Sequence, residues 1–416
     1  MKKKKKSEIT DKHRLKIAML GHKTVPVNFS RDSGGIEVVV EELAKRQVQL
    51  GCDVTCYNRV IHYTNGKRLE GDKLEEYEGI KLKSVFTIDR KGLAAATSSF
   101  FASLKAAVGD YDVVHIHAEG PSVFCWIPKL FGKRVICHNH GIDWKRDKWK
   151  DGFASKYIKF GEWCSAKFAD EIIVLSEGIQ KYFLETYGRK TVLIPNGVNR
   201  PEIRKADEIA RRWRLERDSY ILFLGRLVPE KGLKYLVEAY SKLNTDKKLV
   251  IAGGSSDTDD FVKELKESCK AFQEHVIFTG FVQGKVLDEL YSNAFLYVLP
   301  SDLEGMPLSL LEAMSYGNCC VVSDIDECTA VVEDRGSNIR KAVIFEKGNT
   351  EDLRKTLQVL CDDENLVQRY KAEAADFICN KYNWDDVVEQ VMAVYRGAEV
   401  DFLRGKIDGN HVRNRG

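Results

Sequence analysis

Fold class is decided by one stretch of the chain, Pro300-Ser301-Asp302-Leu303-Glu304-Gly305-Met306-Pro307-Leu308-Ser309-Leu310-Leu311-Glu312-Ala313-Met314. An apolar run over 295–300 predicts a buried strand, a loop with a glycine follows, and a helix is predicted to begin near Pro307. In doubly wound α/β sheets, ligands bind beyond the carboxyl ends of the strands, which is where this loop must lie. Glu304 and Glu312, held there together, can accept hydrogen bonds from two sets of vicinal hydroxyls, although either one alone is more often a solvated charge.

The same order of strand, loop and helix recurs along the whole chain, which is typical of parallel sheets covered by helices. We predict strands over 16–22, 53–59, 82–88, 112–118, 134–138, 171–176 and 191–195, then over 220–225, 248–253, 276–281, 295–300, 320–323 and 342–345. Helices are predicted between them, among others over 36–50, 233–243, 365–381 and 384–396.

Two domains are therefore expected, since 416 residues exceed what one hydrophobic core usually spans. We place an N-terminal α/β domain at 16–198 and a C-terminal one at 199–383, with the change after the turn-rich Pro195-Asn196-Gly197. Both are predicted to be Rossmann-like, doubly wound parallel sheets that face each other across a cleft. The helix at 384–396 is expected to return toward the N-terminal domain, with a disordered basic tail at 1–15 and a loose tail at 397–416.

Composition excludes several classes of protein. A hydrophobic share of 44%, a charged share of 31% and a mean hydropathy of -0.32 are not those of a disordered chain, a fibre or a polytopic membrane protein. The N-terminal lysines precede no apolar segment, so no secretory signal is predicted. The 11 cysteines are odd in number and lack C-x-x-C spacing, which favours reduced thiols in the cytoplasm over a zinc site or a disulfide framework.

Charge is distributed unevenly along the chain. Residues 1–200 hold 35 Lys and Arg against 24 Asp and Glu, a balance of +11, whereas the remainder, with 30 against 38, has -8. A basic half predicts an anionic partner, but no nucleic-acid-binding motif is present and we expect no nucleic-acid partner. The basic and aromatic segment at 144–150 (WKRDKWK) and a helix around Phe100, Phe101 and Leu104 suit an anionic membrane surface. A solvated basic face with core aromatics explains the same residues.

Two further loops carry residues suited to a phosphorylated ligand. In Gly225-Arg226-Leu227-Val228-Pro229-Glu230-Lys231-Gly232, the side chains of Arg226 and Lys231 can hold a diphosphate, or act only at the surface. In Ser33-Gly34-Gly35-Ile36-Glu37, two glycines open a helix whose N–H groups can meet a phosphate or a sugar, or form a simple turn. Neither a G-x-G-x-x-G fingerprint nor a phosphate-binding lysine loop of the Walker type is present.

Four histidines alternate along two predicted strands, so that each pair points to one face of the sheet. They are His115 and His117 on the first strand, and His138 and His140 on the next. His140 comes at the exit of its strand, where it can donate a hydrogen bond to a reacting oxygen or exchange a proton with it. Zinc binding by the four is conceivable, but no neighbouring carboxylate or cysteine spacing argues for it, and a structural histidine is the commoner role for any one of them.

Together these segments resemble the retaining glycosyltransferase family 4 with the GT-B fold, from about residue 16 to residue 396. The most specific piece is the E-x7-E segment from Glu304 to Glu312. The resemblance implies that Arg226 and Lys231 bind the donor diphosphate, and that Glu312 binds the ribose. It makes Glu304 a catalytic residue at the transferred sugar. The remaining residues carried over from the family are the catalytic histidine His140, the capping glycines Gly34 and Gly35, and the donor-loop residues Gly305, Met306, Pro307 and Leu308.

The resemblance also implies a metal-independent transferase of envelope or exopolysaccharide type, without a cofactor. Its expected partners are a nucleotide-sugar donor, a glycan or lipid-linked acceptor and an anionic membrane surface, with a cytoplasmic location at the cytosolic face of the membrane. A GT-B nucleotide-sugar epimerase and an inactive, glycosyltransferase-like scaffold are the alternatives; the first is disfavoured by the E-x7-E segment, the second by the presence of all four charged residues. One departure is Asp326, where relatives often have a proline. The nucleotide, the sugar and the acceptor are not specified by the sequence.

Overall fold

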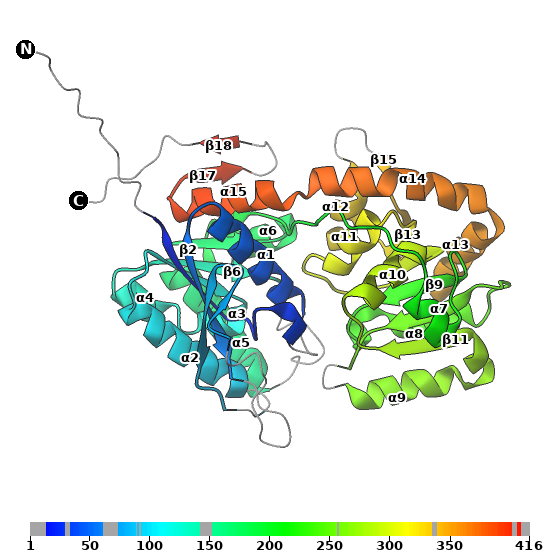
Figure 1. The fold of residues 1–416 in the computed structure, drawn as a ribbon, viewed down its shortest axis with the longest axis horizontal. Helices are drawn as coiled ribbons and strands as arrows, with labels where there is room; N and C mark the ends of the chain where they lie inside the picture. Colours follow the sequence, from blue (N-terminus) through cyan, green and yellow to red (C-terminus); the bar gives the residue numbers. More distant parts are fainter. Residues whose placement is uncertain are drawn as a thin grey trace, which may run out of the picture.

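Two α/β domains lie next to each other in the structure, a computed structural model that describes residues 14–29, 34–60, 74–88, 90, 93–141, 152–255, 258–334, 339–401 and 406–408. Figure 1 shows the first half of the chain in the blue-to-cyan lobe and most of the second half in the green-to-orange lobe. Three predictions fall outside the described residues: the basic tail up to residue 13, Ser33, and the basic and aromatic segment at 144–150.

The N-terminal domain is built on an eight-stranded sheet with the order β3-β4-β2-β1-β5-β6-β7-β8, parallel except for the pair of β3 and β4. The strands are β1 (Lys16–Leu20), β2 (Asp53–Arg59), β3 (Glu76–Tyr77), β4 (Ile80–Val85), β5 (Val113–His117), β6 (Arg134–Asn139), β7 (Glu171–Val174) and β8 (Val192–Leu193). All seven strands predicted here are present. The sequence analysis missed β3, because two residues show no alternation; a tight turn with positive φ at Glu78 and Gly79 joins β3 to β4.

Helices cover both faces of this sheet. They are η1 (Val27–Phe29), α1 (Gly35–Gln49), α2 (Leu93–Val108), α3 (Glu119–Ser122), α4 (Trp126–Leu130), α5 (Phe153–Phe168) and α6 (Glu177–Tyr187). Alternate residues of β1 belong to different apolar clusters, Ile17 and Met19 to one and Ala18 and Leu20 to the other, so each face of the sheet has its own core.

The C-terminal domain has a six-stranded parallel sheet with the order β11-β10-β9-β12-β13-β16. Its strands are β9 (Tyr220–Leu224), β10 (Lys248–Ala252), β11 (Val276–Gly280), β12 (Leu296–Leu299), β13 (Cys320–Ser323) and β16 (Val343–Phe345). The helices are α7 (Glu208–Trp213), η5 (Pro229–Lys231), α8 (Leu233–Tyr240), α9 (Asp259–Ser268), η6 (Lys270–His275), α10 (Lys285–Asn293), α11 (Leu308–Ser315), α12 (Asp326–Val332), α13 (Thr350–Asp362) and α14 (Glu364–Lys381). A short hairpin joins β14 (Glu333–Asp334) and β15 (Ile339–Arg340). All six strands predicted for this half are present.

The chain passes between the domains at two places that pack on each other. After β8 it runs through Asn196 and Gly197, and after α14 it returns into α15 (Trp384–Tyr395). Val198 N–H donates to the carbonyl of Tyr382 (2.8 Å), and a Cβ on Gly197 would lie 2.5 Å from the Trp384 ring. α15 buries Trp384 and its following apolar residues in a core of the N-terminal domain. Figure 1 shows this orange-red helix lying over the blue lobe.

Part of the segment predicted to be loose, 397–416, is ordered. β17 (Glu399–Asp401) and β18 (Lys406–Asp408) form a two-stranded antiparallel sheet, and β17 lies against α15 and β8. The sequence analysis missed both strands, because three residues are too few to show an alternation of apolar and polar positions. Among the described helices, none has the length and apolar content needed to cross a bilayer.

Candidate functional site

The loop between β12 and α11 holds Glu304 at the carboxyl end of the C-terminal sheet. Its Oε1 accepts hydrogen bonds from Lys231 Nζ (2.5 Å) and from Ser301 Oγ (2.6 Å). The side chains of Lys231 and Glu304 are only 12% and 9% exposed, so each charge compensates the other where the loops after β9 and β12 meet, a region we call the loop cluster. Two residues that the sequence analysis assigned to separate motifs are therefore an ion pair.

Backbone contacts hold the loop after β9, which carries Lys231, against the loop after β12, which carries Glu304. Asp302 N–H donates to the Glu230 carbonyl (2.8 Å), and Gly232, with φ +66, approaches so closely that a Cβ on it would lie 1.8 Å from the Pro300 carbonyl oxygen. Only glycine fits that position. Arg226, the other predicted diphosphate ligand, directly follows β9 and its side chain is exposed at the same edge of the sheet.

Glu312 lies inside α11, which begins at Leu308 directly after Pro307, as predicted. Tyr291 from α10 donates its hydroxyl to Glu312 Oε2 (3.0 Å). Burial raises the pKa of Glu312 to about 7; Tyr291 opposes this rise, and the Asp288 carboxylate adds to it. The sequence analysis missed Tyr291, because a tyrosine within an amphipathic helix is indistinguishable from a core aromatic.

The glutamate loop touches the N-terminal domain. A Cβ on Gly305 would lie 2.1 Å from the His140 carbonyl oxygen, and Asn196 N–H donates to Met306 Sδ (3.0 Å). At the start of α11, Leu308 reaches Gly35, where a Cβ would lie 2.9 Å from Leu308 Cδ1. The structure thus brings predicted residues of both domains to one boundary.

Gly34 precedes α1, and its N–H donates to Glu37 Oε2 (2.7 Å). Glu37 is buried and its other oxygen accepts from Lys23 N–H (2.9 Å). A carboxylate at a helix N-terminus is favourable because that end carries partial positive charge. A donor phosphate bound at this glycine would have to compete with Glu37 for the same N–H group, which the sequence analysis did not foresee.

His115 and His117 point to one face of β5, as predicted, and the pairing of β5 with β6 places His138 beside His117, with His140 directly after β6. Their rings are adjacent, with centroids 4.2 Å apart for His115 and His117 and 4.3 Å for His138 and His140. His115, His117 and His138 are buried, whereas His140, after the end of β6, is partly exposed. Burial lowers the pKa of His115 to about 3, and it lowers the pKa values of His117 and His138 well below the ordinary value. These three imidazoles are therefore neutral.

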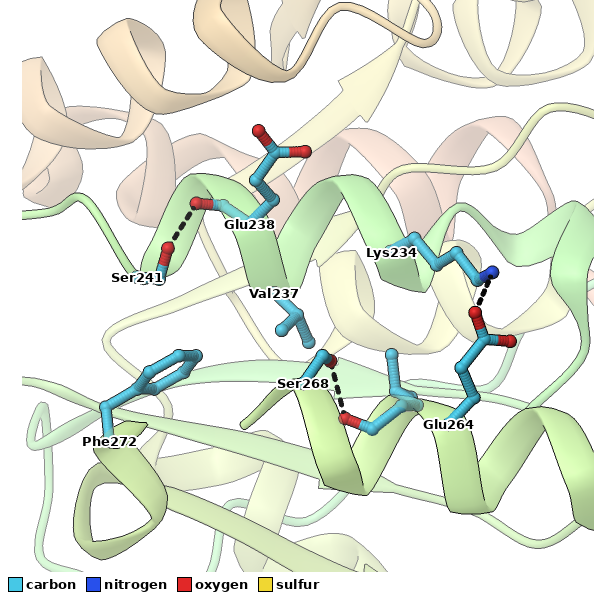
Figure 2. A pocket seen from close by; sticks show the side chains of 8 residues that line it. Lys234, Val237, Glu238, Ser241, Glu264, Ser268 and Phe272 are labelled. Carbon is cyan, nitrogen blue, oxygen red and sulfur yellow. Dashed lines mark hydrogen bonds and ion pairs between the residues drawn. The ribbon is translucent and has the colours of Figure 1, made fainter. Parts of the chain in front are cut away.

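Two hollows of the described part of the chain bear on the site. One is a groove between α8 and α9, where Lys234 pairs with Glu264 (2.7 Å), as Figure 2 shows; it contains none of the predicted site residues. The other is a cleft of about 360 Å³ between the domains, lined by Pro195, Gly305 and Met306 among others. This cleft adjoins the glutamate loop, so a ligand has room to enter at the domain boundary.

The comparisons with known proteins cover both domains. The family described as Glycosyltransferase Family 4 matches residues 33–200, and the family described as Glycosyl transferases group 1 matches residues 205–395. An uncharacterized glycosyltransferase of Methanocaldococcus jannaschii is 25% identical over 414 residues, covering 92% of this chain and 98% of the relative. Phosphatidyl-myo-inositol mannosyltransferase of Mycobacterium leprae is 27% identical over 296 residues, which cover 69% of this chain and 74% of the relative. The fold is similar to that of Anabaena HepE, solved with UDP and glucose, with a TM-score of 0.73 and 17% sequence identity. The superposition covers 92% of this chain and 99% of HepE.

Proposed function

Because the chain is a glycosyltransferase of family 4 with the GT-B fold, we propose that it transfers a sugar from a nucleoside diphosphate to a glycan or lipid-linked acceptor, with retention and without a metal at the donor site. One observation carries this proposal: Glu304, paired with Lys231, lies in the loop whose Gly305 contacts the backbone of His140 in the other domain. A donor held by the C-terminal domain would meet the acceptor side at that point.

Transfer breaks the bond between the anomeric carbon and the diphosphate oxygen and forms a bond from that carbon to an acceptor hydroxyl oxygen, whose proton passes to the departing diphosphate or to a protein base. Negative charge builds on the diphosphate as it departs. In our proposal Arg226 and Lys231 stabilise this charge as fixed cations, so no metal is required. Glu312, a half-buried residue of α11, accepts hydrogen bonds from the ribose hydroxyls through its carboxylate.

The sugar itself would lie at the domain boundary. We assign Glu304 to the transferred sugar near its anomeric carbon, and His140 to a hydrogen bond or proton exchange with a reacting oxygen. Gly34 and Gly35 would cover the donor from the N-terminal domain, and the backbone from Gly305 to Leu308 would line it from the other side. Closure of the domains would exclude water, which limits hydrolysis of the donor.

An epimerase and an inactive scaffold are not favoured. Glycosyltransferase families match both domains, and the carboxylates and cations expected of a donor site are all present. The acceptor remains a proposal: one relative is named as a phosphatidyl-myo-inositol mannosyltransferase, which supports a lipid-linked acceptor in envelope or polysaccharide assembly.

The nucleotide specificity of the donor site is tested by thermal melts with UDP, GDP, dTDP and ADP. A ligand at 100 times its dissociation constant stabilises a protein by roughly 2.7 kcal/mol, so one of the four should raise Tm clearly. Glu312→Gln should abolish most of this rise, whereas Glu238→Gln, a change at an exposed glutamate of α8, should leave it intact. If none of the nucleotides raises Tm of the unaltered protein, the proposal is refuted.

The same binding should depend on pH because Glu312 titrates near neutrality. Its pKa of about 7 makes the carboxylate mostly protonated below that pH and ionised above it, and the ionised form is the better acceptor for ribose hydroxyls. Affinity should thus be roughly tenfold weaker at about pH 6 than at about pH 8. Glu312→Gln should remove this dependence, apart from what titration of the nucleotide phosphate contributes. An equally steep dependence in the variant would contradict the role of Glu312.

We further propose that the N-terminal domain rests on an anionic membrane surface at the cytosolic face. Support comes from the neighbouring helices α2, α4 and α5, which expose Leu104 (41%), Leu130 (75%) and Phe160 (51%) together with nearby lysines. Vesicles with anionic lipid should sediment the protein at low salt and neutral vesicles should not. Phe160→Ser should weaken sedimentation and Phe281→Ser, in the other domain, should not; no sedimentation at all would refute this location.

A further inference from the structure

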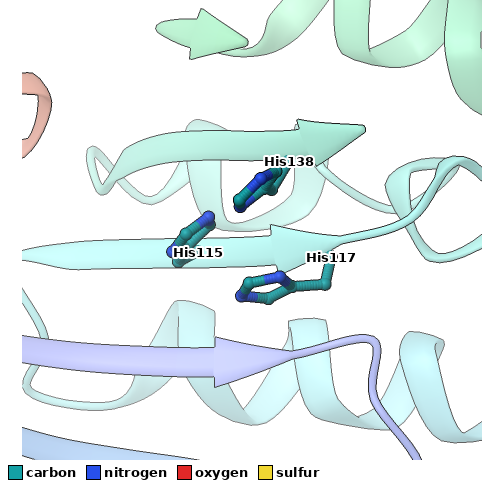
Figure 3. Close-up of side chains that lie close together, drawn as sticks. All are labelled: His115, His117 and His138. Carbon is teal, nitrogen blue, oxygen red and sulfur yellow. The ribbon is translucent and has the colours of Figure 1, made fainter. Parts of the chain in front are cut away.

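Three histidines form a closed cluster in the core of the N-terminal domain. His117 and His138 are direct partners in the parallel pairing of β5 with β6, and His115 is two residues before His117, on the same face. The three side chains are between 0% and 3% exposed. One nitrogen of each ring lies within 4.8 Å of a nitrogen of each of the other two rings. Figure 3 shows the three side chains close together on two neighbouring strands.

The nitrogens that face this cluster lack hydrogen bonds to the part of the chain that the structure describes. His115 Nε2, His117 Nε2 and both ring nitrogens of His138 are buried and without a partner. Each neutral imidazole has one donor and one acceptor, and buried polar atoms are nearly always satisfied. Because a neutral His138 carries a proton on one of its two nitrogens, three of these four nitrogens can present lone pairs, and three buried lone pairs in one place indicate a missing cation.

The outer nitrogens, in contrast, are engaged in the manner of metal-ligating histidines. His115 Nδ1 lies 2.6 Å from Tyr395 Oη, to which Gln47 Nε2 also donates (3.2 Å). His117 Nδ1 lies 3.1 Å from His140 Nε2. With a proton on each Nδ1, both rings turn the lone pair of Nε2 toward the cluster, which is the orientation that outer partners give to metal ligands.

We propose that His115, His117 and His138 bind a divalent transition-metal ion of the zinc type, through Nε2 of the first two rings and one nitrogen of the third. Three imidazoles with no carboxylate among them suit zinc and its neighbours rather than magnesium or calcium. The His115 and His138 rings are stacked in parallel, with an interplanar angle of 1°, so bonds of about 2.0–2.1 Å require the rings to rotate until their planes converge on the ion. This proposal departs from the sequence-based expectation of no metal. The proposed ion lies in the N-terminal domain, whereas the donor diphosphate is assigned to the C-terminal domain.

Binding of the ion has a consequence for His140. Once His117 Nε2 is a ligand, its Nδ1–H must donate to His140 Nε2, and a neutral His140 then carries its own proton on Nδ1. The ion thereby fixes the tautomer of the histidine at the domain boundary. His117 is a positioning residue in this arrangement, not a catalytic one.

Metal content of the full-length chain, freed of any histidine tag, tests the site. The protein is stripped with a chelator, incubated with Zn²⁺ or Co²⁺ either folded or during refolding, dialysed and analysed by mass spectrometry. We expect about one ion per chain and, with Co²⁺, the visible absorption of a tetrahedral site. His138→Leu and His117→Gln should lose the ion, whereas His275→Gln, a change at an exposed histidine, should keep it.

The variants give separate information. His138→Leu removes a ring that has no hydrogen bond to any described residue and should stay folded, as a melt can verify. Tyr395→Phe removes the outer partner of His115 and should weaken metal affinity about 10- to 100-fold without abolishing it. The proposal is overturned if the unaltered protein binds no ion under either condition, or if His138→Leu and His117→Gln bind as much as it does. Because the readout is metal content, it is independent of sugar transfer.

Discussion

Replacing Lys231 with alanine is expected to lower kcat/KM for sugar transfer by about 10²- to 10³-fold, the usual loss on removing one group that stabilises developing negative charge. The side chain is held in the loop cluster by Glu304 and is mostly buried, so its charge acts through a medium that screens it weakly. No other lysine of the described loops pairs with Glu304. The measurement is steady-state transfer with the nucleotide sugar identified by the melts.

Lys234→Ala provides a matched control for this prediction. It removes a lysine from α8, three residues further on, whose side chain is 57% exposed and pairs with Glu264 in the groove of Figure 2. Transfer should remain within about twofold of the unaltered enzyme, because exposed ion pairs contribute little. A Lys231→Ala enzyme that is as active as Lys234→Ala would contradict the diphosphate role.

The double variant Lys231→Ala/Glu304→Gln separates stability from chemistry. Removing the lysine alone leaves the Glu304 carboxylate with little exposure and without its cation, which should lower Tm. Neutralising Glu304 as well should restore much of Tm, since no uncompensated charge remains. Activity should stay low in the double variant, because the diphosphate still lacks its cation.

Gly305→Ala is expected to lower transfer by about 100-fold or more while nucleotide binding changes little. The added Cβ would lie 2.1 Å from the His140 carbonyl oxygen and 3.1 Å from Gly141 Cα, so the two domains must move apart. Displacements of about 1 Å in a reacting geometry cost about 10²-fold in rate. Gly305 has no left-handed φ, so alanine adds this contact without straining the backbone.

Two measurements are needed for Gly305→Ala: transfer rate, and the rise in Tm with the preferred nucleotide. Gly178→Ala is the control, since a Cβ on this exposed glycine of α6 would meet only Ser176 Oγ, at 3.8 Å. Loss of transfer with intact nucleotide binding is the expected pattern. Normal transfer by Gly305→Ala would show that the close approach of the domains is not required for the reaction.

Sequence alone determined the framework of the protein. Apart from β3, the strands of both sheets were predicted within a few residues, because buried apolar runs and glycine-bearing turns are local signals. The glutamate loop was correctly placed at the carboxyl end of a strand for the same reason, and the alternation correctly put His115 and His117 on one face of their strand.

Tertiary structure decided which side chains become partners. Lys231 and Glu304 are 73 residues apart, and Tyr291 and Glu312 are 21 apart; their pairing depends on how loops and helices pack around the sheet. The same holds for Gly305 at His140 and for Tyr395 behind His115, each of which joins segments from opposite ends of the fold. The local sequence pattern determines which face of a helix or strand a residue occupies. Its partner, its burial and hence its pKa follow only from the packing of distant segments.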